Sequence, residues 1–422
     1  MSKVNIKVVH ITRVEGHGNI VAALDEGRIE EVMFQVVEAI RFFEGILRGR
    51  SWEEVGHIAT RICGICAVSH CCASLQGTEK ALGIEVSAQT ELLRRLIMNG
   101  EIMSSHALHV YFLAAPDFLR LESVLPLVQE DPETVKRAFH IKQNSYDIGN
   151  LLGGRHTHPI SLVPGGFTSL PSVSDLERLR ERLTGLRCDV EKTVELYARL
   201  EIPDLERETE YVCLRRPDYY TFYGGQIVSS DGDALPAERY REAISEFVVG
   251  HSTAKHAKWH RESYMVGALA RVNNNWKQLR PEAHEAMNTL SLKPPCHNPF
   301  MNTVAQVVEL VHCLEDSITL LGEILDKGLR EEYEPEVTPR AGQGVGAVEA
   351  PRGLLIHDYT YNDRGRSTNV NCVIPTAQNL GNLDADMRML LSELKDKPEE
   401  DIRRGLEMLV RAYDPCISCS AH

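Results

Sequence analysis

Alternating apolar and polar residues mark the N-terminal part of the chain, in the stretches NIKVVHI, NIVAAL and EVMFQVV between residues 4 and 37. Glycine and Asp-Glu-Gly breaks separate these stretches, and this combination is typical of short strands joined by turns. A second region of the same kind runs from about 346 to 375 and includes GLLIHDYTY and NVNCVIP. We therefore expect β-structure near both ends of the chain.

The longest segments between these two regions follow the helical period. They predict long helices over residues 88–115, 130–150, 173–201 and 302–329, and shorter ones near 236–249 and 398–412. The segments 88–115 and 302–329 are apolar on much of their circumference. Because a helix that is apolar all round is buried, we expect both in the middle of a bundle.

No internal repeat, low-complexity tract or flexible linker divides the 422 residues. The pattern predicts a single, mainly α domain with peripheral β-structure (α+β class), built around a central bundle of long helices. Its expected parts are a β-rich segment at 1–50, a helical bundle at 51–345, and a β ribbon with the C-terminal segment at 346–422.

Composition and charge narrow the class of protein. Hydrophobic residues make up 43% of the chain and charged residues 25%, as in an ordinary globular domain. The net charge of −14 argues against binding to nucleic acid or to an anionic membrane, since both need a basic surface. No run of about 18 apolar residues predicts a membrane span, and the stretch MSKVNIKVVH lacks the features of a signal peptide. We expect a cytoplasmic protein.

Eleven cysteines are present, and in a cytoplasmic protein we expect them to be thiols. Seven are mostly isolated, and burial as small apolar residues explains each of them. The other four form two Cys-x-x-Cys pairs near opposite ends of the chain, Cys63 with Cys66 and Cys416 with Cys419. Together the pairs can make a four-sulfur site suited to zinc, iron or another thiophilic metal.

The spacing of the two pairs leaves a structural zinc and a buried functional metal both open. Zinc ribbons usually bring both pairs from within a few tens of residues, whereas most of this chain lies between them. Gly64 lets backbone N–H groups approach a metal without a side chain in the way. Pro415 cannot continue the helical segment EDIRRGLEMLVRAY that precedes it. We therefore expect both pairs at helix ends.

Longer motifs around both pairs resemble those of a known family, the large, catalytic subunit of nickel–iron hydrogenases. RICGICAVSH (61–70) resembles the motif Arg-x-Cys-Gly-x-Cys-x-x-x-His of that family, and DPCISCSAH (414–422) resembles its motif Asp-Pro-Cys-x-x-Cys-x-x-His. Further similar stretches occur in the family's order: RVEGHG (13–18), RFFEGILRGR (41–50), SHALHVYFLAAPD (105–117), GGRHTHP (153–159), EAPRG (349–353) and IPTAQN (374–379). The resemblance covers essentially the whole chain.

The resemblance implies reversible, heterolytic cleavage of dihydrogen at a nickel–iron centre whose iron carries carbonyl and cyanide ligands. Cys63 and Cys416 match the thiolates that bind nickel alone. Cys66 and Cys419 match those that bridge nickel and iron. Soft thiolate donors suit nickel, so the implied ligands agree with the chemistry of the two pairs.

The family also implies a path for the proton. Cys416 is the expected first acceptor, and Glu15 of RVEGH matches the family's relay carboxylate. A carboxylate near the metals can accept a proton and pass it outward. On the residues alone, a cap or a pair with Arg13 between two strands is the favoured interpretation of Glu15, and the resemblance favours the relay.

Arg352 of EAPRG resembles the arginine that lies over the open face between the metals, and the neighbouring Pro351 is expected to contact the cofactor. A buried guanidinium needs carboxylate partners. Asp117 and Asp414 match the family residues that supply them, although each alone also fits an ordinary capping or turn aspartate.

Two further sites follow from the same resemblance. Pro375 and Thr376 resemble the pocket that holds the cyanide of the iron, where a hydroxyl can donate a hydrogen bond. Glu44, a backbone carbonyl that we place at Cys372, and His422 match the ligands of a buried hard cation, usually Mg²⁺. A nitrogen ligand is unusual for magnesium, so this assignment rests on the resemblance.

The histidines of GHSTAKHAKWH, which are His251, His256 and His260, form a second candidate metal pattern. Because no carboxylate or thiol accompanies them in the sequence, we interpret them as solvated or supporting residues. His106 and His109 lie one turn apart on an apolar helix, and we expect them to be hydrogen-bonded core residues.

The sequence lacks motifs for electron carriers, and this indicates partner subunits. Beyond the four metal cysteines, no cluster of cysteines could hold an iron–sulfur centre, and no Gly-x-Gly-x-x-Gly nucleotide motif is present. We expect an obligate iron–sulfur small subunit, with further acceptor subunits of the flavin or heterodisulfide-reductase type. PTAQN replaces the Thr-Thr-Trp-Asn of respiratory members, which favours the cytoplasmic group of archaea and bacteria. Deazaflavin, NAD(P), sulfur and heterodisulfide reductase all remain open as acceptors.

Other interpretations of the chain stay possible at this point. A dihydrogen-sensing homologue with little turnover would carry the same ligands, and a structural zinc-thiolate protein would carry the same cysteines. The related quinone-reductase subunits of respiratory complexes lack the four thiolates. In the family, nickel chaperones load the metal and a protease then removes an extension after the final histidine. A chain that ends at His422 therefore resembles the processed form, or a chain truncated there.

Overall fold

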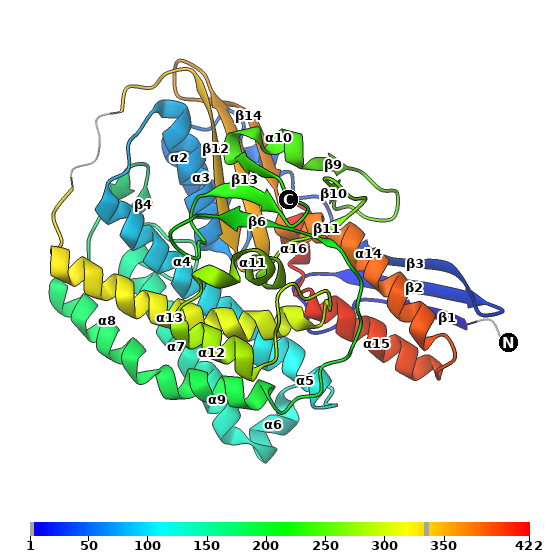
Figure 1. Cartoon of the computed structure of the whole chain (residues 1–422). Coiled ribbons are helices and arrows are strands. Elements are labelled where there is room, and N and C mark those ends of the chain that lie inside the picture. Colours follow the sequence, from blue (N-terminus) through cyan, green and yellow to red (C-terminus); the bar gives the residue numbers. More distant parts are fainter. Residues whose placement is uncertain (1–3, 333–336) are drawn as a thin grey trace.

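Long, buried helices form the centre of the molecule (Figure 1). The computed structural model describes residues 4–332 and 337–422. The central helix is α4 (Ala88–Leu108). It packs against both α7 (Pro132–Gly153) and α13 (Met301–Lys327). In α13 most side chains in the first four turns are buried, as expected for a helix that is apolar on most sides. The predicted α+β class with a central helical bundle is confirmed.

Several predicted helices have different bounds in the structure. The segment 173–201 forms two helices, α8 (Val173–Gly185) and α9 (Arg187–Tyr197), which meet at Leu186. Helix α4 continues through a π-helical turn at His109–Ala114 into α5 (Ala115–Phe118). The helix expected at 398–412 is confirmed as α15 (Glu399–Ala412).

The helix predicted near 236–249 is wrong for most of its length. A short 3₁₀ turn (Ala237–Arg239) and α10 (Tyr240–Ala243) are followed by the strand β9 (Ser245–Phe247), which pairs with β10 (His256–Lys258). The hydrogen bonds of this ladder outweigh the weak local preference for helix.

Several helices of the structure were not predicted. They are α1 (Phe43–Leu47), α2 (Trp52–Ala59), α3 (Ala67–Leu82), α6 (Leu125–Glu130), α11 (Ala268–Asn275), α12 (Pro281–Thr289) and α14 (Pro375–Leu394). In α3 every side chain except that of Lys80 is buried. A helix that is surrounded on all sides has no polar face, so its period is invisible in the sequence.

Both predicted β regions are confirmed. Strands β1 (Val4–Val8), β2 (Gly18–Asp25) and β3 (Arg28–Val36) form an antiparallel sheet. Strands β12 (Gly342–Ala350), β13 (Gly353–Tyr361) and β14 (Ser367–Val373) form a second one. The region expected to be a helical bundle also contains strands besides β9 and β10. Four of them form one sheet, in the order β11 (Tyr264–Met265), β6 (Glu210–Arg215), β7 (Gln226–Ser229) and β8 (Ala234–Pro236). Two more, β4 (Leu162–Val163) and β5 (Gly166–Phe167), pair with each other.

Glycines bring α3 unusually close to the second sheet. A Cβ atom on Gly344 or Gly346 of β12 would collide with the backbone of α3 at Gly77 or Ala73. Only glycine permits this distance between a strand and a helix. The contact sets the first turn of α3 beside the turn that joins β12 to β13, and both take part in the candidate site.

The C-terminus lies inside the molecule, next to the short helix α16 (Ile417–Ser420), as Figure 1 shows. Cys416 and Cys419 are buried, and His422 is mostly covered. Among the helices of residues 4–332 and 337–422, none is long and apolar enough to cross a membrane.

Candidate metal centre

The four predicted cysteine ligands come together in one buried cluster. Cys63 follows a 3₁₀ turn and Cys66 begins α3, whereas Cys416 begins α16 and Cys419 lies within it. The Sγ atoms are separated by 3.6 Å for Cys63 and Cys416, 3.7 Å for Cys66 and Cys419, and 2.7 Å for Cys416 and Cys419. All four lie within 4.8 Å of one another, so both pairs are at helix ends, as expected.

The donor set fits a thiophilic cation. Burial raises the pKa of Cys416 and of Cys419 well above the ordinary thiol value. Four thiolates at these distances would repel one another strongly, so their charge needs a multivalent metal among them. Backbone N–H groups of Ile65 and Cys66 point at the sulfur of Cys63, with N–S distances of 3.3 and 3.2 Å.

Backbone hydrogen bonds hold the C-terminal segment against the rest of the site. The N–H of Ile417 donates to the carbonyl of Glu15 (3.0 Å), and the N–H of Cys416 donates to the hydroxyl of Thr376 (2.9 Å). Arg41 donates to the carbonyls of Ile62 and Ser418 and so joins the two cysteine loops. The helix α15 ends at Ala412, before Pro415, which agrees with the sequence prediction.

An enclosed cavity adjoins three of the four sulfur atoms. Its lining consists of Cys66, His70, Ala350, Arg352, Leu355, Ile374, Pro375, Thr376, Cys416 and Cys419. The hydroxyl of Thr376 accepts from Cys416, which leaves its own proton free to donate toward this space. A small group with a hydrogen-bond acceptor would therefore find both apolar walls and a donor here.

Arg352 is buried at the edge of this cavity and pairs with Asp414. Its Nε donates to the carbonyl oxygen of Asp414 (2.6 Å), and its Nη2 donates to the carboxylate (2.8 Å). The other carboxylate oxygen accepts from Gln306 (3.0 Å). These two hydrogen bonds orient the guanidinium, and Nη1 makes a long contact with the hydroxyl of Ser105 (3.5 Å). The N–H groups that remain are available to the cavity.

The expected pairing of Asp117 with Arg352 is corrected by the structure. The carboxylate of Asp117 accepts two hydrogen bonds from Arg411, at 2.8 and 3.0 Å, and also pairs with Arg13. Asp117 lies in α5, at the junction of the N-terminal segment and α15, so it joins these elements. The sequence order of the motifs does not reveal which arginine an aspartate will meet.

A buried network that the sequence did not reveal holds the turn that carries Arg352. Arg271 donates to both oxygens of Glu309 (2.6 and 2.7 Å) and to Glu349 (3.0 Å). It also donates to the carbonyls of Ala350 and Pro351, both at 3.0 Å. All five N–H groups of the guanidinium are thereby used. The acidic Glu349 of EAPRG was the one available signal that a cationic partner was needed.

Glu15 contacts the segment between the two C-terminal cysteines. Its carboxylate accepts from the N–H of Ser418 (3.1 Å) and from the hydroxyl of the same residue. Its backbone pairs with that of Cys416 in a short parallel bridge. Arg13 turns instead to Asp117, so the alternative in which Glu15 pairs with Arg13 is not what the structure contains.

The residues expected at the hard-cation site also meet. The imidazole Nε2 of His422 lies 3.4 Å from the carboxylate of Glu44, and the N–H of Cys372 donates to that carboxylate (2.9 Å). Cys372 lies on the edge strand β14, and the N–H and carbonyl of one residue in an antiparallel strand point to the same side, so its carbonyl also points out from the edge of the sheet. Burial opposes ionisation of Glu44, but His422 and the Cys372 amide outweigh it and lower its pKa to about 2.

Two charged neighbours of this site were not predicted. The ammonium of Lys255 lies 3.9 Å from the carboxylate of Glu44 and 3.5 Å from that of Glu246. Glu246 lies within the segment 236–249, where the sequence predicted a helix, and Lys255 lies in the following loop. Neither position gave a reason to expect proximity to the C-terminus.

The structure separates the histidines into two groups. His106 contacts Glu309 at 2.7 Å, and His109 contacts Gln306 and the carbonyl of Arg411, so the expected hydrogen-bonded core roles are confirmed. The interpretation of the GHSTAKHAKWH histidines needs correction, because carboxylates distant in sequence accompany them. Asp384 approaches His251 and His256, and Glu210 with Asp231 approaches His260.

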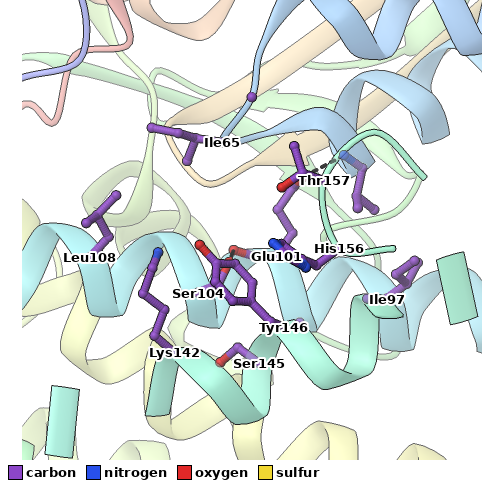
Figure 2. Close-up of a pocket in the computed structure, with 14 residues that line it drawn as sticks. Ile65, Ile97, Glu101, Ser104, Leu108, Lys142, Ser145, Tyr146, His156 and Thr157 are labelled. Carbon is purple, nitrogen blue, oxygen red and sulfur yellow. Dashed lines mark hydrogen bonds between the residues drawn. The ribbon is translucent and has the colours of Figure 1, made fainter. Parts of the chain in front are cut away.

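A second cavity, of about 70 Å³, lies on the outer side of the first cysteine loop (Figure 2). Glu101 and Ser104 of α4 face Lys142 and Tyr146 of α7 across it, with His156 beside them. Glu101 accepts from the N–H groups of Val68 (2.6 Å) and Ser69 (2.9 Å), at the first turn of α3. Burial raises its pKa to about 8. Glu101 thus anchors the helix that begins at Cys66.

Comparison with known proteins identifies the family. The model of the nickel-dependent hydrogenase family matches residues 41–139 and 226–422, and a HoxL-like model matches residues 5–39. The chain is 37% identical to the alpha chain of sulfhydrogenase 1 from Pyrococcus furiosus, over 99% of this chain and 97% of that protein. It is 35% identical to the alpha chain of sulfhydrogenase 2 from the same organism, over 99% and 98% of the two chains.

Solved structures agree in fold. The structure of an NAD⁺-reducing [NiFe]-hydrogenase in the H₂-reduced state superposes with a TM-score of 0.90 at 27% identity, over 100% of both chains. The nickel–iron–selenium hydrogenase of D. vulgaris Hildenborough shares the fold, with a TM-score of 0.81 at 22% identity and full coverage of both chains.

The fold and the cysteine cluster define the class of protein: it is the large subunit of a hydrogenase, an oxidoreductase that acts on hydrogen. The chain belongs to the nickel-dependent hydrogenase family, and the four-cysteine cluster fits its nickel–iron centre. Within the family it is similar to the sulfhydrogenase, F420-non-reducing and NAD-reducing enzymes.

Proposed function

We propose that this chain cleaves dihydrogen reversibly at a nickel–iron centre whose iron carries carbonyl and cyanide ligands. Cys63 and Cys416 would hold nickel alone, and Cys66 and Cys419 would bridge nickel to iron. The cavity beside the cluster is lined by Cys66, Cys416 and Cys419, which would leave room there for the iron and its small ligands; the division among the four thiolates itself rests on the resemblance. When bound, such a centre supplies heterolytic cleavage and takes up the two electrons.

The proton leaves, in this proposal, through residues of the chain itself. The thiolate of Cys416 receives it first, and the carboxylate of Glu15 receives it next. The contact of Glu15 with Ser418, which lies between the two C-terminal cysteines, supports this order. Both contacts stabilise the ionised carboxylate, so Glu15 would take up the proton as the Ser418 hydroxyl turns its own proton away.

Arg352 would orient the substrate within the cavity. Its charge is held by Asp414, and Gln306 in turn fixes the second oxygen of Asp414. Pro351 would help to position Arg352, because its carbonyl accepts a hydrogen bond from Arg271 and so fixes the backbone just before Arg352. Pro375 and Thr376 would surround the diatomic ligands of the iron. Asp117 is left with a supporting role at the junction of α5 and α15.

A Mg²⁺ ion held by Glu44, His422 and the carbonyl of Cys372 would fasten the C-terminal residues over the centre. The Nδ1 atom of His422 is buried and has no hydrogen-bond partner within residues 4–332 and 337–422, which leaves the ring free to adjust its position. A cation would also offset the negative charge that Glu44 and Glu246 concentrate there.

Electrons would pass to an iron–sulfur small subunit. Among the residues that the structure describes, the four-sulfur cluster is the one group with three or more cysteine ligands, so carriers are expected in a partner. Flavin- or heterodisulfide-reductase-type subunits, a maturation protease and nickel chaperones would complete the system in the cytoplasm. The relatives' names include sulfhydrogenase and NAD-reducing enzymes, so several acceptors fit this chain.

One observation carries the proposal: four buried cysteine sulfurs from opposite ends of the chain lie within 4.8 Å of one another. Elemental analysis of the purified complex is the test. Nickel and iron are expected in the wild type, and the Cys419→Ser variant is expected to lose nickel. Cys188→Ser serves as the matched control, because Cys188 is exposed. Zinc in place of nickel would contradict the proposal, and nickel with negligible hydrogen uptake would indicate a sensor.

A further inference from the structure

A cluster of two histidines and one aspartate lies apart from the cysteine site. His251 is in the loop between β9 and β10, His256 is the first residue of β10, and Asp384 is in the middle of α14. One ligand atom from each lies within 4.8 Å of the other two. The rings of His251 and His256 meet edge to face, with centroids 5.5 Å apart and planes at 81°.

The polar atoms that face one another in this cluster have no protein partner. The Nε2 atoms of both histidines are buried and make no hydrogen bond with any described residue. Asp384 uses Oδ1 to accept from the N–H of Phe34 (2.7 Å). Its Oδ2 lies 3.5 Å from Nε2 of His251, which is too far for a good hydrogen bond. Unpaired buried groups cost about 1–3 kcal/mol each, so the two unpartnered imidazole nitrogens beside a carboxylate indicate a ligand.

The spacing and the donor types suit a transition-metal cation. Bonds of about 2.1 Å from zinc to nitrogen and oxygen put neighbouring ligand atoms of a tetrahedron about 3.4 Å apart, close to the 3.5 Å between His251 and Asp384. Two imidazoles and a carboxylate favour Zn²⁺ over Mg²⁺ or Ca²⁺.

The charges around the cluster permit a divalent ion. Glu31 of β3 and Arg388 of α14 lie near enough to affect His251 and Asp384 respectively, and their charges have opposite signs. With the Asp384 carboxylate, the surroundings carry one net negative charge.

We propose that His251, His256 and Asp384 bind Zn²⁺, with a water molecule as the fourth ligand. The ion would tie the β9–β10 loop to α14 and, through the bond from Phe34 to Asp384, to β3. Helix α14 begins at Pro375 and carries Thr376 against Cys416. Zinc at this position would therefore brace the helix that forms one wall of the candidate metal centre. This inference does not depend on the identity of the metal held by the four cysteines.

The test combines metal content with anomalous diffraction on the purified complex. Crystals grown with ZnSO₄ are expected to show an anomalous peak between His251, His256 and Asp384. The peak should be present in data collected at an X-ray energy above the zinc absorption edge and absent from data collected below that edge. Asp384→Asn keeps the acceptor for Phe34 but weakens ligation, and it is expected to lose one zinc per complex. Its nickel content should be unchanged, which shows that the variant has folded and matured.

His251→Gln provides a second variant and should lose the same zinc. His140→Ala is the control, since His140 is exposed and pairs with Asp189 on the surface; its zinc content should equal that of the wild type. Absence of the peak in zinc-supplemented wild-type crystals, or retention of zinc at this place by both variants, would overturn the proposal. Zinc at the four cysteine sulfurs would instead contradict the proposed function. The anomalous peak between His251, His256 and Asp384 would still test the zinc site separately.

Discussion

Replacement of Arg271 by methionine should destabilise the part of the molecule that carries Arg352. Methionine preserves much of the length and the apolar stem of arginine, but removes the charge and all five donors. Glu309 and Glu349, both fully buried, would lose their shared partner, and the carbonyls of Ala350 and Pro351 would lose theirs. A buried ion pair broken on one side costs about 3–5 kcal/mol, because it leaves an uncompensated charge.

The pKa of Glu309 gives a second measure of this cost. Burial raises the pKa of this carboxyl, but Arg271, assisted by His106, outweighs burial and lowers it from 4.5 to about 2. At about 1.4 kcal/mol per pKa unit, that fall corresponds to about 3 kcal/mol. Because the folded-state pKa is the lower one, the stabilisation is complete above about pH 4.5 and is lost as the pH falls toward 2. The pKa shift, of which Arg271 is the largest favourable cause, agrees in magnitude with the cost of about 3–5 kcal/mol for breaking the buried pair.

Hydrogen–deuterium exchange of peptides from α11, which carries Arg271, is the appropriate assay. A loss of about 3–5 kcal/mol should accelerate their exchange by about 10²–10⁴-fold, if exchange follows the local opening equilibrium. The control is Arg239→Met, which removes an arginine from an exposed pair with Glu242. A surface pair contributes about 0–1 kcal/mol, so exchange of its own peptide should change less than about tenfold. A change below tenfold in α11 would refute the account of the buried network.

Three further variants test the site. Glu15→Gln should slow dye-linked hydrogen oxidation by about 10²–10⁴-fold, the range of a lost proton-transfer group, with nickel content unchanged; loss of nickel would indicate a structural role. Arg352→Lys should lower kcat by about 10²–10³-fold, since a lysine cannot reproduce the oriented donors, and an unchanged kcat would exclude the proposed orientation of substrate. Glu44→Gln should reduce the magnesium content of the complex and expose the C-terminal residues to carboxypeptidase, and neither change would occur if Glu44 only paired with His422.

The sequence predicted secondary structure correctly where a regular hydrophobic period extends over the full length of an element. The strands at 4–37 and 346–375 and the buried helix α13 were predictable because each has a regular pattern over many residues. Helix α3 was not, since nearly all its side chains are buried and its polar face is missing. The 236–249 region failed because the pairing of β9 with β10 is a tertiary effect that local preference cannot express.

Prediction of the site depended on contiguous motifs. The four cysteines, Glu15 and Arg352 stand in such motifs, and the structure brings them together. Pairings across the chain were less accessible, and Asp117 shows the limit. The resemblance to the family suggested Arg352 as its partner, whereas the folded chain presents Arg411 and Arg13. Asp384, nearly 130 residues from the histidines that it approaches, could not be associated with them before the fold was known.

The presence of a nickel–iron centre with diatomic ligands is the central claim about this chain. Infrared spectroscopy of the purified, nickel-loaded complex tests it most directly, because carbonyl and cyanide ligands absorb where protein and water are nearly transparent. The account predicts both kinds of stretching band in the wild type and their loss in Cys419→Ser. A nickel-loaded, active wild-type complex without these bands would contradict it.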